Sequence, residues 1–74
     1  MKAFKIIEFL IKDELEAIDG YVKAIDDLRA SGVSEEDIQE LEKIKKDEYD
    51  HISILQKISA KNKFDEINIQ RMGE

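Results

Sequence analysis

The sequence predicts an all-α fold, namely an antiparallel two-helix hairpin with a short C-terminal segment. Two such hairpins are expected to associate into a four-helix bundle. Apolar residues recur at steps of three and four in each half of the 74-residue chain, and this spacing places side chains on one face of a helix. There is no proline, so no position forces a helix to break. We therefore expect a single domain, residues 1–74.

The first helix is predicted over residues 3–30. The opening residues contain a lysine and apolar side chains but are soon interrupted by acids, so they are expected to form the first helical turn rather than a signal peptide. Gly20 lies inside the helix, where glycine costs about 1 kcal/mol relative to alanine. It marks either a close approach between helices or chains, or a tolerated surface position. The stripe on this helix consists of Phe4, Ile7, Ile11, Glu14, Ile18, Tyr21, Ile25 and Leu28.

A short turn is predicted between the two helices. Gly32 suits the left-handed position that follows a helix end, and Ser34 is a good N-cap because three acids follow it in the first turn of the next helix. The second helix is predicted over residues 34–61. A connection this short makes the two helices antiparallel neighbours. The stripe on the second helix consists of Leu41, Ile44, Glu48, His51, Leu55 and Ile58.

The remaining tail, residues 62–74, keeps several apolar side chains: Phe64, Ile67, Ile69 and Met72. It is too apolar to be a purely solvated tail and too short to fold alone. We expect a short third helix, a docking segment at a subunit contact, or a peptide that a partner protein binds.

The composition limits the classes of partner and metal. A net charge of −6 with 41% charged residues argues against nucleic acid as the main partner, because no basic stripe is available to contact phosphates. An acidic surface attracts cations, or it simply keeps a small helical protein soluble. No apolar run approaches the roughly 20 residues of a membrane span. Because the chain has no cysteine, a metal would bind through oxygen and imidazole, which favours iron or manganese, with zinc as a further alternative. We expect a cytoplasmic protein.

Three polar residues interrupt the apolar stripes: Glu14 on the first helix, and Glu48 and His51 on the second. A carboxylate left unpaired in a core costs several kcal/mol or more. In a hairpin whose turn is centred near position 32, Glu14 lies 18 residues before the centre and Glu48 lies 16 after it. The two are then level to within about one helical turn, 5.4 Å. Taken alone, a Glu-x-x-His pair is more often a surface feature, and Glu14 could result from a rotated stripe. Together, the three residues predict a metal site.

One chain supplies only half of a two-metal ligand set. A hairpin of this size also has too small a core to be very stable alone. We therefore expect two copies of the chain to associate. Two copies would provide four carboxylates and two imidazoles, and two divalent cations would balance the four negative charges. Glu48 is expected to bridge the ions, Glu14 to be a terminal ligand and His51 to supply nitrogen. Tyr21 is either a core aromatic residue or a hydrogen-bond donor beside the site.

At these residues the chain resembles the ferritin-like di-iron family, especially rubrerythrin and the encapsulated ferritins. Residues 13–21 look like the first iron-binding helix of that family, in which the ligand glutamate precedes an alanine by three positions and a tyrosine by seven. Residues 47–51 look like its Asp-Glu-x-x-His second helix. The resemblance implies a di-iron ferroxidase centre built between two subunits. It also implies that Asp13 and Glu16 line a secondary metal site near that centre, and that a protein shell is a partner.

The expected function is therefore oxidation of Fe(II) by oxygen or peroxide at Glu14, Glu48 and His51, serving iron storage or detoxification in a homodimer or higher homo-oligomer. Two alternatives remain open. The chain could be a non-catalytic, metal-stapled oligomerisation or adaptor module. It could also be an acidic coiled-coil hairpin that binds no metal.

Overall fold

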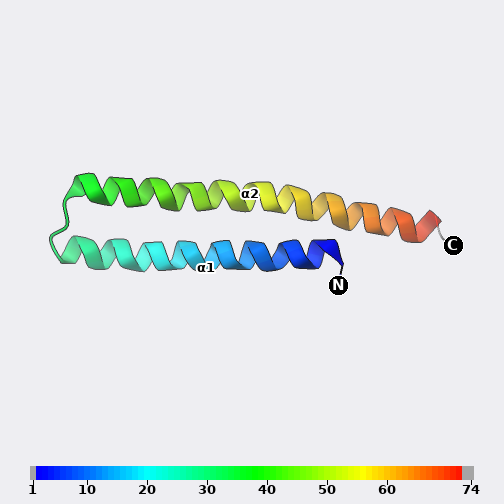
Figure 1. The fold of residues 1–74 in the computed structure, drawn as a ribbon, viewed down its shortest axis with the longest axis horizontal. Helices are drawn as coiled ribbons and strands as arrows, with labels where there is room; N and C mark the ends of the chain where they lie inside the picture. Colours follow the sequence, from blue (N-terminus) through cyan, green and yellow to red (C-terminus); the bar gives the residue numbers. More distant parts are fainter. Residues whose placement is uncertain (1, 73–74) are drawn as a thin grey trace.

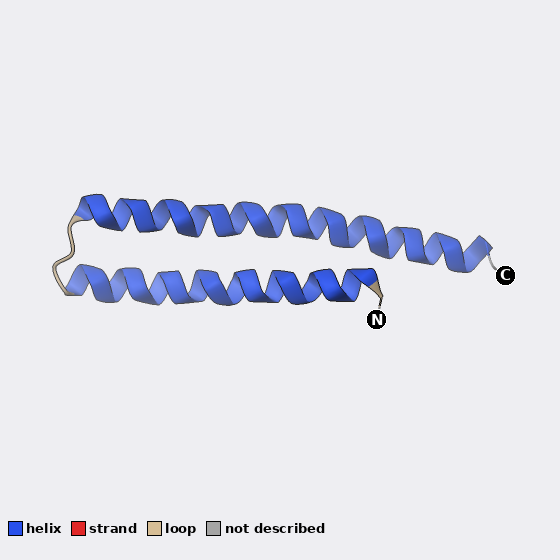
Figure 2. Ribbon diagram, in the orientation of Figure 1, coloured by secondary structure: helices blue, strands red, loops and turns tan. Residues whose placement is uncertain are grey.

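The computed structural model describes residues 2–72, and the side chains of residues 2–64. Helix α1 (Ala3–Ala30) and helix α2 (Glu35–Met72) lie side by side and antiparallel (Figure 1). Within the described residues the chain has no strand (Figure 2). The hairpin is long and thin, with extents of 63 × 17 × 10 Å. The predicted all-α hairpin is thus confirmed, whereas the pairing of two hairpins stays a prediction.

Helix α1 has the predicted bounds, and its end has the features expected from the sequence. Gly32 has a φ of 85°, which the absence of a Cβ allows without strain. The Val33 N–H donates to the Leu28 carbonyl at 3.1 Å, and the Gly32 N–H donates to the Arg29 carbonyl at 3.1 Å. These two bonds form a Schellman motif, which satisfies carbonyls that the helix itself leaves free.

Helix α2 begins one residue later than predicted, because Ser34 is its N-cap. The Asp37 N–H donates to Ser34 Oγ at 3.2 Å, and the Ile38 N–H donates to the Ser34 carbonyl at 3.0 Å. The first turn contains Glu35, Glu36 and Asp37, whose negative charge is favourable at the positive end of the helix dipole.

The predicted end of the second helix near residue 61 is wrong, because α2 continues to Met72. No proline or glycine occurs between residues 34 and 72. Instead of breaking the helix, the Asn62 side chain donates to the Ile58 carbonyl one turn earlier, at 2.9 Å. The polar residues 61–63 interrupt the apolar stripe but leave the backbone helical. Residues 2–72 therefore contain no separate third helix, and α2, with 38 residues against 28 in α1, projects past the start of α1 (Figure 1).

The stripe of α1 is confirmed, because all of its members are half-buried or buried along the seam with α2. Among the described side chains, four apolar ones are buried: Ile18, Ile25, Ile38 and Ile52. A hairpin of this size thus has a thin core.

The stripe predicted for α2 is only partly correct. Glu48 is half-buried, as are Leu41 and Leu55, but the stripe's Ile44, His51 and Ile58 are exposed. A single partner helix cannot cover the whole width of a 3,4 stripe, so one side of it lies against α1 and the other side faces outward. The seam is completed by residues on the opposite side of the stripe: Ile38, Lys45 and Ile52.

Large apolar side chains remain exposed on both helices, including Ile6, Leu10, Ile44, Ile58 and Phe64. A Cβ added at Gly20 would meet nothing within 4 Å, so Gly20 marks no close approach between the two helices of one hairpin. Neither helix, over its described residues, combines the length and the apolar character that crossing a membrane requires.

Candidate metal centre

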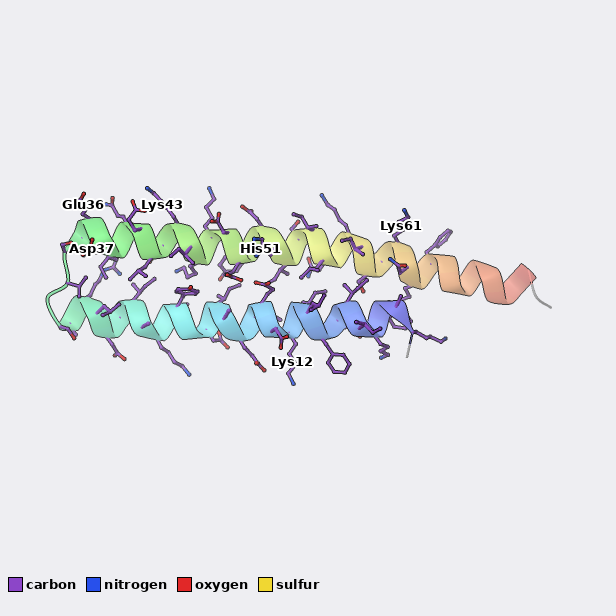
Figure 3. The ribbon with its side chains drawn as sticks, in the orientation of Figure 1. Lys12, Glu36, Asp37, Lys43, His51 and Lys61 are labelled. Atoms are coloured by element: carbon purple, nitrogen blue, oxygen red, sulfur yellow. The ribbon has the colours of Figure 1, made fainter. Side chains whose placement is uncertain are left out.

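Glu14, Glu48 and His51 come together midway along the hairpin. Helix α1 supplies Glu14, and α2 supplies the other two, which are separated by one helical turn. His51 Nδ1 lies 3.6 Å from Glu14 Oε2 and 3.8 Å from Glu48 Oε2. One ligand atom from each residue lies within 4.8 Å of the other two. Figure 3 labels His51 near the middle of α2, well away from both ends of the molecule.

The Glu14 carboxylate of this cluster has one buried oxygen without a hydrogen-bond donor among the described residues. The side chain of Glu14 is 26% exposed and that of Glu48 is 19% exposed. Glu14 Oε2 is buried and accepts no hydrogen bond from the described residues. The His51 nitrogen, at 3.6 Å, is too distant for a good hydrogen bond. A buried acceptor without a donor costs about 1–3 kcal/mol, and more when it is charged. A bound cation would remove this cost.

The donor set suits a divalent metal ion. Carboxylate oxygens and imidazole nitrogens bind iron, manganese and zinc. Two ligand atoms on opposite sides of an ion are roughly 4.4 Å apart, since each lies about 2.2 Å from it. The cluster is therefore close to the size that one ion requires. Three ligands are fewer than a closed site contains, and the His51 side chain is 53% exposed, so the cluster is open on the side of His51.

No protein-family model, curated protein or solved structure matches this chain. The resemblance to the ferritin-like di-iron family therefore rests on the two motifs in the sequence, and it stays a prediction.

The other residues predicted for the site are placed differently. Tyr21 is half-buried on the seam, two turns along α1 from Glu14, which fits a core aromatic residue. Asp13 and Glu16 flank Glu14 in sequence but are exposed, and neither belongs to the cluster of Glu14, Glu48 and His51. Their assignment to a secondary metal site stays a prediction.

A lysine that the apolar stripes do not include also lies close to the centre. Lys45 lies one turn before Glu48 on the seam, its side chain is only 23% exposed, and its Nζ is 2.8 Å from Glu42 Oε2. The spacing of seven residues from Ile38 to Lys45 and from Lys45 to Ile52 was the available signal. The long aliphatic part of a lysine can cover apolar surface while its ammonium group stays near water. This ion pair therefore lies on the seam beside the cluster of Glu14, Glu48 and His51.

Proposed function

We propose that two copies of this chain join their Glu14–Glu48–His51 clusters into a di-iron centre that oxidises Fe(II). One observation supports this most directly: Glu14 Oε2 is buried without a donor and lies within ion-pair distance of His51. A carboxylate buried in the core of a hairpin destabilises the folded state unless a cation neutralises it.

A second copy is needed because one chain offers too few ligands. Iron in bundle cores of this type takes a glutamate from each of two helices and a Glu-x-x-His pair from each of the other two. Each hairpin offers one glutamate and one such pair. Two divalent ions then balance four carboxylates, so the assembled centre carries no excess charge.

The surface of the hairpin also supports a partner. The chain exposes 5764 Å², whereas a compact monomer of 8.6 kDa exposes about 4,700 Å². The excess reflects a thin molecule with large apolar side chains outside. Some of these, including Ile44 and Ile58, lie on the same side of α2 as His51, at intervals of seven residues. A partner that completes the metal centre would cover them as well.

The residues have distinct tasks in this proposal. Glu48 would be shared by both ions, Glu14 would hold one ion, and His51 would supply the nitrogen ligand. Anionic oxygen ligands stabilise Fe(III) more than Fe(II) because the interaction grows with the charge of the ion, so this ligand set favours loss of an electron. Fe(II) is the substrate: two Fe(II) give two electrons to O₂, which takes up two protons and leaves as hydrogen peroxide. With hydrogen peroxide as the oxidant, the same two electrons and two protons yield two water molecules.

An anaerobic titration with Fe(II), followed by air, tests the proposal. We expect one Fe(II) bound per chain, then oxygen consumption and an absorbance rise as Fe(III) forms. Glu48→Ala should abolish oxidation, and His51→Ala should weaken Fe(II) binding strongly. The matched control is Glu40→Ala, which removes an exposed glutamate from the same helix and should leave both properties unchanged. Native oxidation rates in both Glu48→Ala and His51→Ala would contradict the assignment.

The second candidate function is a metal-stapled oligomerisation or adaptor module without turnover. The thin core favours it, since only four described apolar side chains are buried and small domains commonly need a staple. In that case Zn(II) would stabilise the dimer as well as Fe(II) does, and adding Fe(II) in air would consume no more oxygen than buffer does. Measurable oxidation that requires Glu48 would exclude this function.

A hairpin 17 Å across and 10 Å deep cannot enclose a mineral. Iron storage or detoxification would therefore require a higher homo-oligomer or a protein shell around the dimers. The dimer remains the unit that performs the chemistry.

A further inference from the structure

A lysine occupies a seam position one helical turn from the metal cluster. Lys45 is half-buried, and the residues seven positions before and after it on α2, Ile38 and Ile52, are buried isoleucines. Glu48, three residues after Lys45, belongs to the cluster. A positively charged side chain therefore lies next to a carboxylate that a metal ion would have to bind.

Lys45 has a glutamate one turn away in each direction along α2. Side chains three or four residues apart are neighbours on the surface of a helix. Of the four positions at these distances from Lys45, two hold a carboxylate, Glu42 and Glu48, and the other two hold Leu41 and Tyr49. In the structure the ammonium group pairs with Glu42, with Nζ 2.8 Å from Oε2. The same ammonium group has Glu48 as its alternative partner on the helix.

Helix geometry and exposure both favour the pairing with Glu42. Each Cα–Cβ bond of an α-helix tilts toward the N-terminus, so the Lys45 side chain leans toward Glu42 and away from Glu48. A pair in which the glutamate precedes the lysine is also the more favourable order. The side chain of Glu42 is 38% exposed and that of Glu48 is 19% exposed, so pairing with Glu42 leaves the ammonium group closer to water.

We propose that Glu42 is a positioning residue of the metal centre, which holds the Lys45 ammonium group away from the half-buried carboxylate of Glu48. The inference rests on the proposed metal centre and adds to it a residue outside the ligand set. Without the charge of Glu42, the carboxylate left to Lys45 on α2 is that of Glu48. A metal ion would then have to displace the ammonium group before it could bind, so the affinity for the metal falls.

Positioning differs from a simple effect of charge in one measurable way. The carboxylate of Glu42 also attracts a cation at a distance, and that attraction is the same whether or not Lys45 is present. If charge alone acted, the effects of replacing the two residues would therefore add. If Glu42 acts by holding Lys45, replacing Glu42 has no effect once Lys45 is gone.

A double-mutant cycle on Zn(II) affinity, measured by calorimetric titration, separates the two cases. Glu42→Gln should weaken Zn(II) binding about three- to fivefold, Lys45→Met should not weaken it, and the double variant should bind as Lys45→Met does. The matched control is the pair of Glu40 and Lys43, which has the same spacing on α2, a distance of 2.9 Å and greater exposure. Glu40→Gln should change the affinity less than about twofold, with or without Lys43→Met.

The metal-free protein provides a readout that involves no metal. The carboxyl ¹³C resonance of Glu48 should change little when Lys45→Met is introduced into the parent. It should shift when Lys45→Met is introduced into Glu42→Gln, because the ammonium group is then removed from Glu48 itself. Equal responses in the two backgrounds would overturn the proposed transfer of Lys45.

The Zn(II) titrations can also overturn the positioning role. Unchanged affinity in Glu42→Gln would do so, as would a loss that is equally large in the Lys45→Met background, which would indicate an effect of charge alone. If the parent still binds one Fe(II) per chain and oxidises it in either case, the proposed function stands without this role for Glu42. A parent that binds neither Zn(II) nor Fe(II) would overturn both proposals.

Discussion

Replacing Glu14 by leucine is expected to stabilise the metal-free protein. Glu14 Oε2 is buried and accepts no hydrogen bond from the described residues, and in a dimer it would face three further carboxylates. Exchanging a buried charge for an apolar group of similar size is often neutral or stabilising by about 1–4 kcal/mol. The side chain of Glu14 is still 26% exposed, so solvent screens part of the penalty. We therefore expect the lower half of that range, about 1–2 kcal/mol per chain in the free energy of unfolding.

The melting temperature converts this energy into a measurable shift. For a domain of 60–100 residues, each kcal/mol moves Tm by about 4–8 °C, so metal-free Glu14→Leu should melt about 4–16 °C above the parent. With metal bound, the parent should instead melt at a higher temperature than the variant. A ligand present at a hundred times its Kd stabilises the folded state by about 2.7 kcal/mol, and this gain should appear in the parent but be largely lost in the variant.

The assay is thermal unfolding followed by circular dichroism, first with a chelator and then with Fe(II) under anaerobic conditions, Mn(II) or Zn(II). Glu8→Leu is the matched control, because it removes an exposed glutamate from the same helix and should change the free energy of unfolding by less than about 0.5 kcal/mol. The reasoning would be refuted if none of the three metals changed the Tm of the parent and the leucine variant were less stable than the parent. Glu14 would then be an ordinary surface residue.

Three further predictions concern assembly and fold. Diluting the metal-free protein should yield monomers that no longer retain Fe(II), and adding Fe(II) should restore dimers in analytical ultracentrifugation; a monomer that holds two ions would contradict the shared centre. Ile38→Ala should lower the free energy of unfolding by about 2–5 kcal/mol in chemical denaturation, because Ile38 is 0% exposed, and a loss below about 1 kcal/mol would mean that the seam does not depend on it. Gly32→Ala should destabilise the hairpin by about 1–2 kcal/mol because its φ of 85° is unfavourable for residues with a Cβ, and an unchanged Tm would contradict that account of the turn.

Most of the fold could be predicted from local chemistry. The end of α1 depends on Gly32 and the start of α2 depends on Ser34, and both act through bonds to their nearest neighbours in sequence. Such signals do not require knowledge of the rest of the molecule. The end of α2 was misjudged because a polar stretch at residues 61–63 stops the apolar pattern without stopping the helix. Only a proline, a glycine or a competing side-chain bond would have ended it there.

The clustering of Glu14, Glu48 and His51 was also predictable, since helical spacing and the position of the turn place Glu14 and Glu48 at one level. What the pattern could not give was the division of the α2 stripe into a seam side and an outward side. Apolar periodicity indicates which positions of a helix are buried in the final assembly. It does not indicate which neighbouring helix buries each position.

This division is the reason to expect a second copy. If α1 were the only partner of α2, we would expect the apolar stripe of α2 to be narrow enough for one helix to cover. Instead Ile44, His51 and Ile58 keep the spacing of buried residues while lying exposed in the hairpin. The one imidazole of the chain lies among them, beside a carboxylate oxygen that has no donor. Both the apolar residues and the incomplete ligand set are accounted for when the same face meets its own copy, because one contact then covers the isoleucines and supplies the missing ligands.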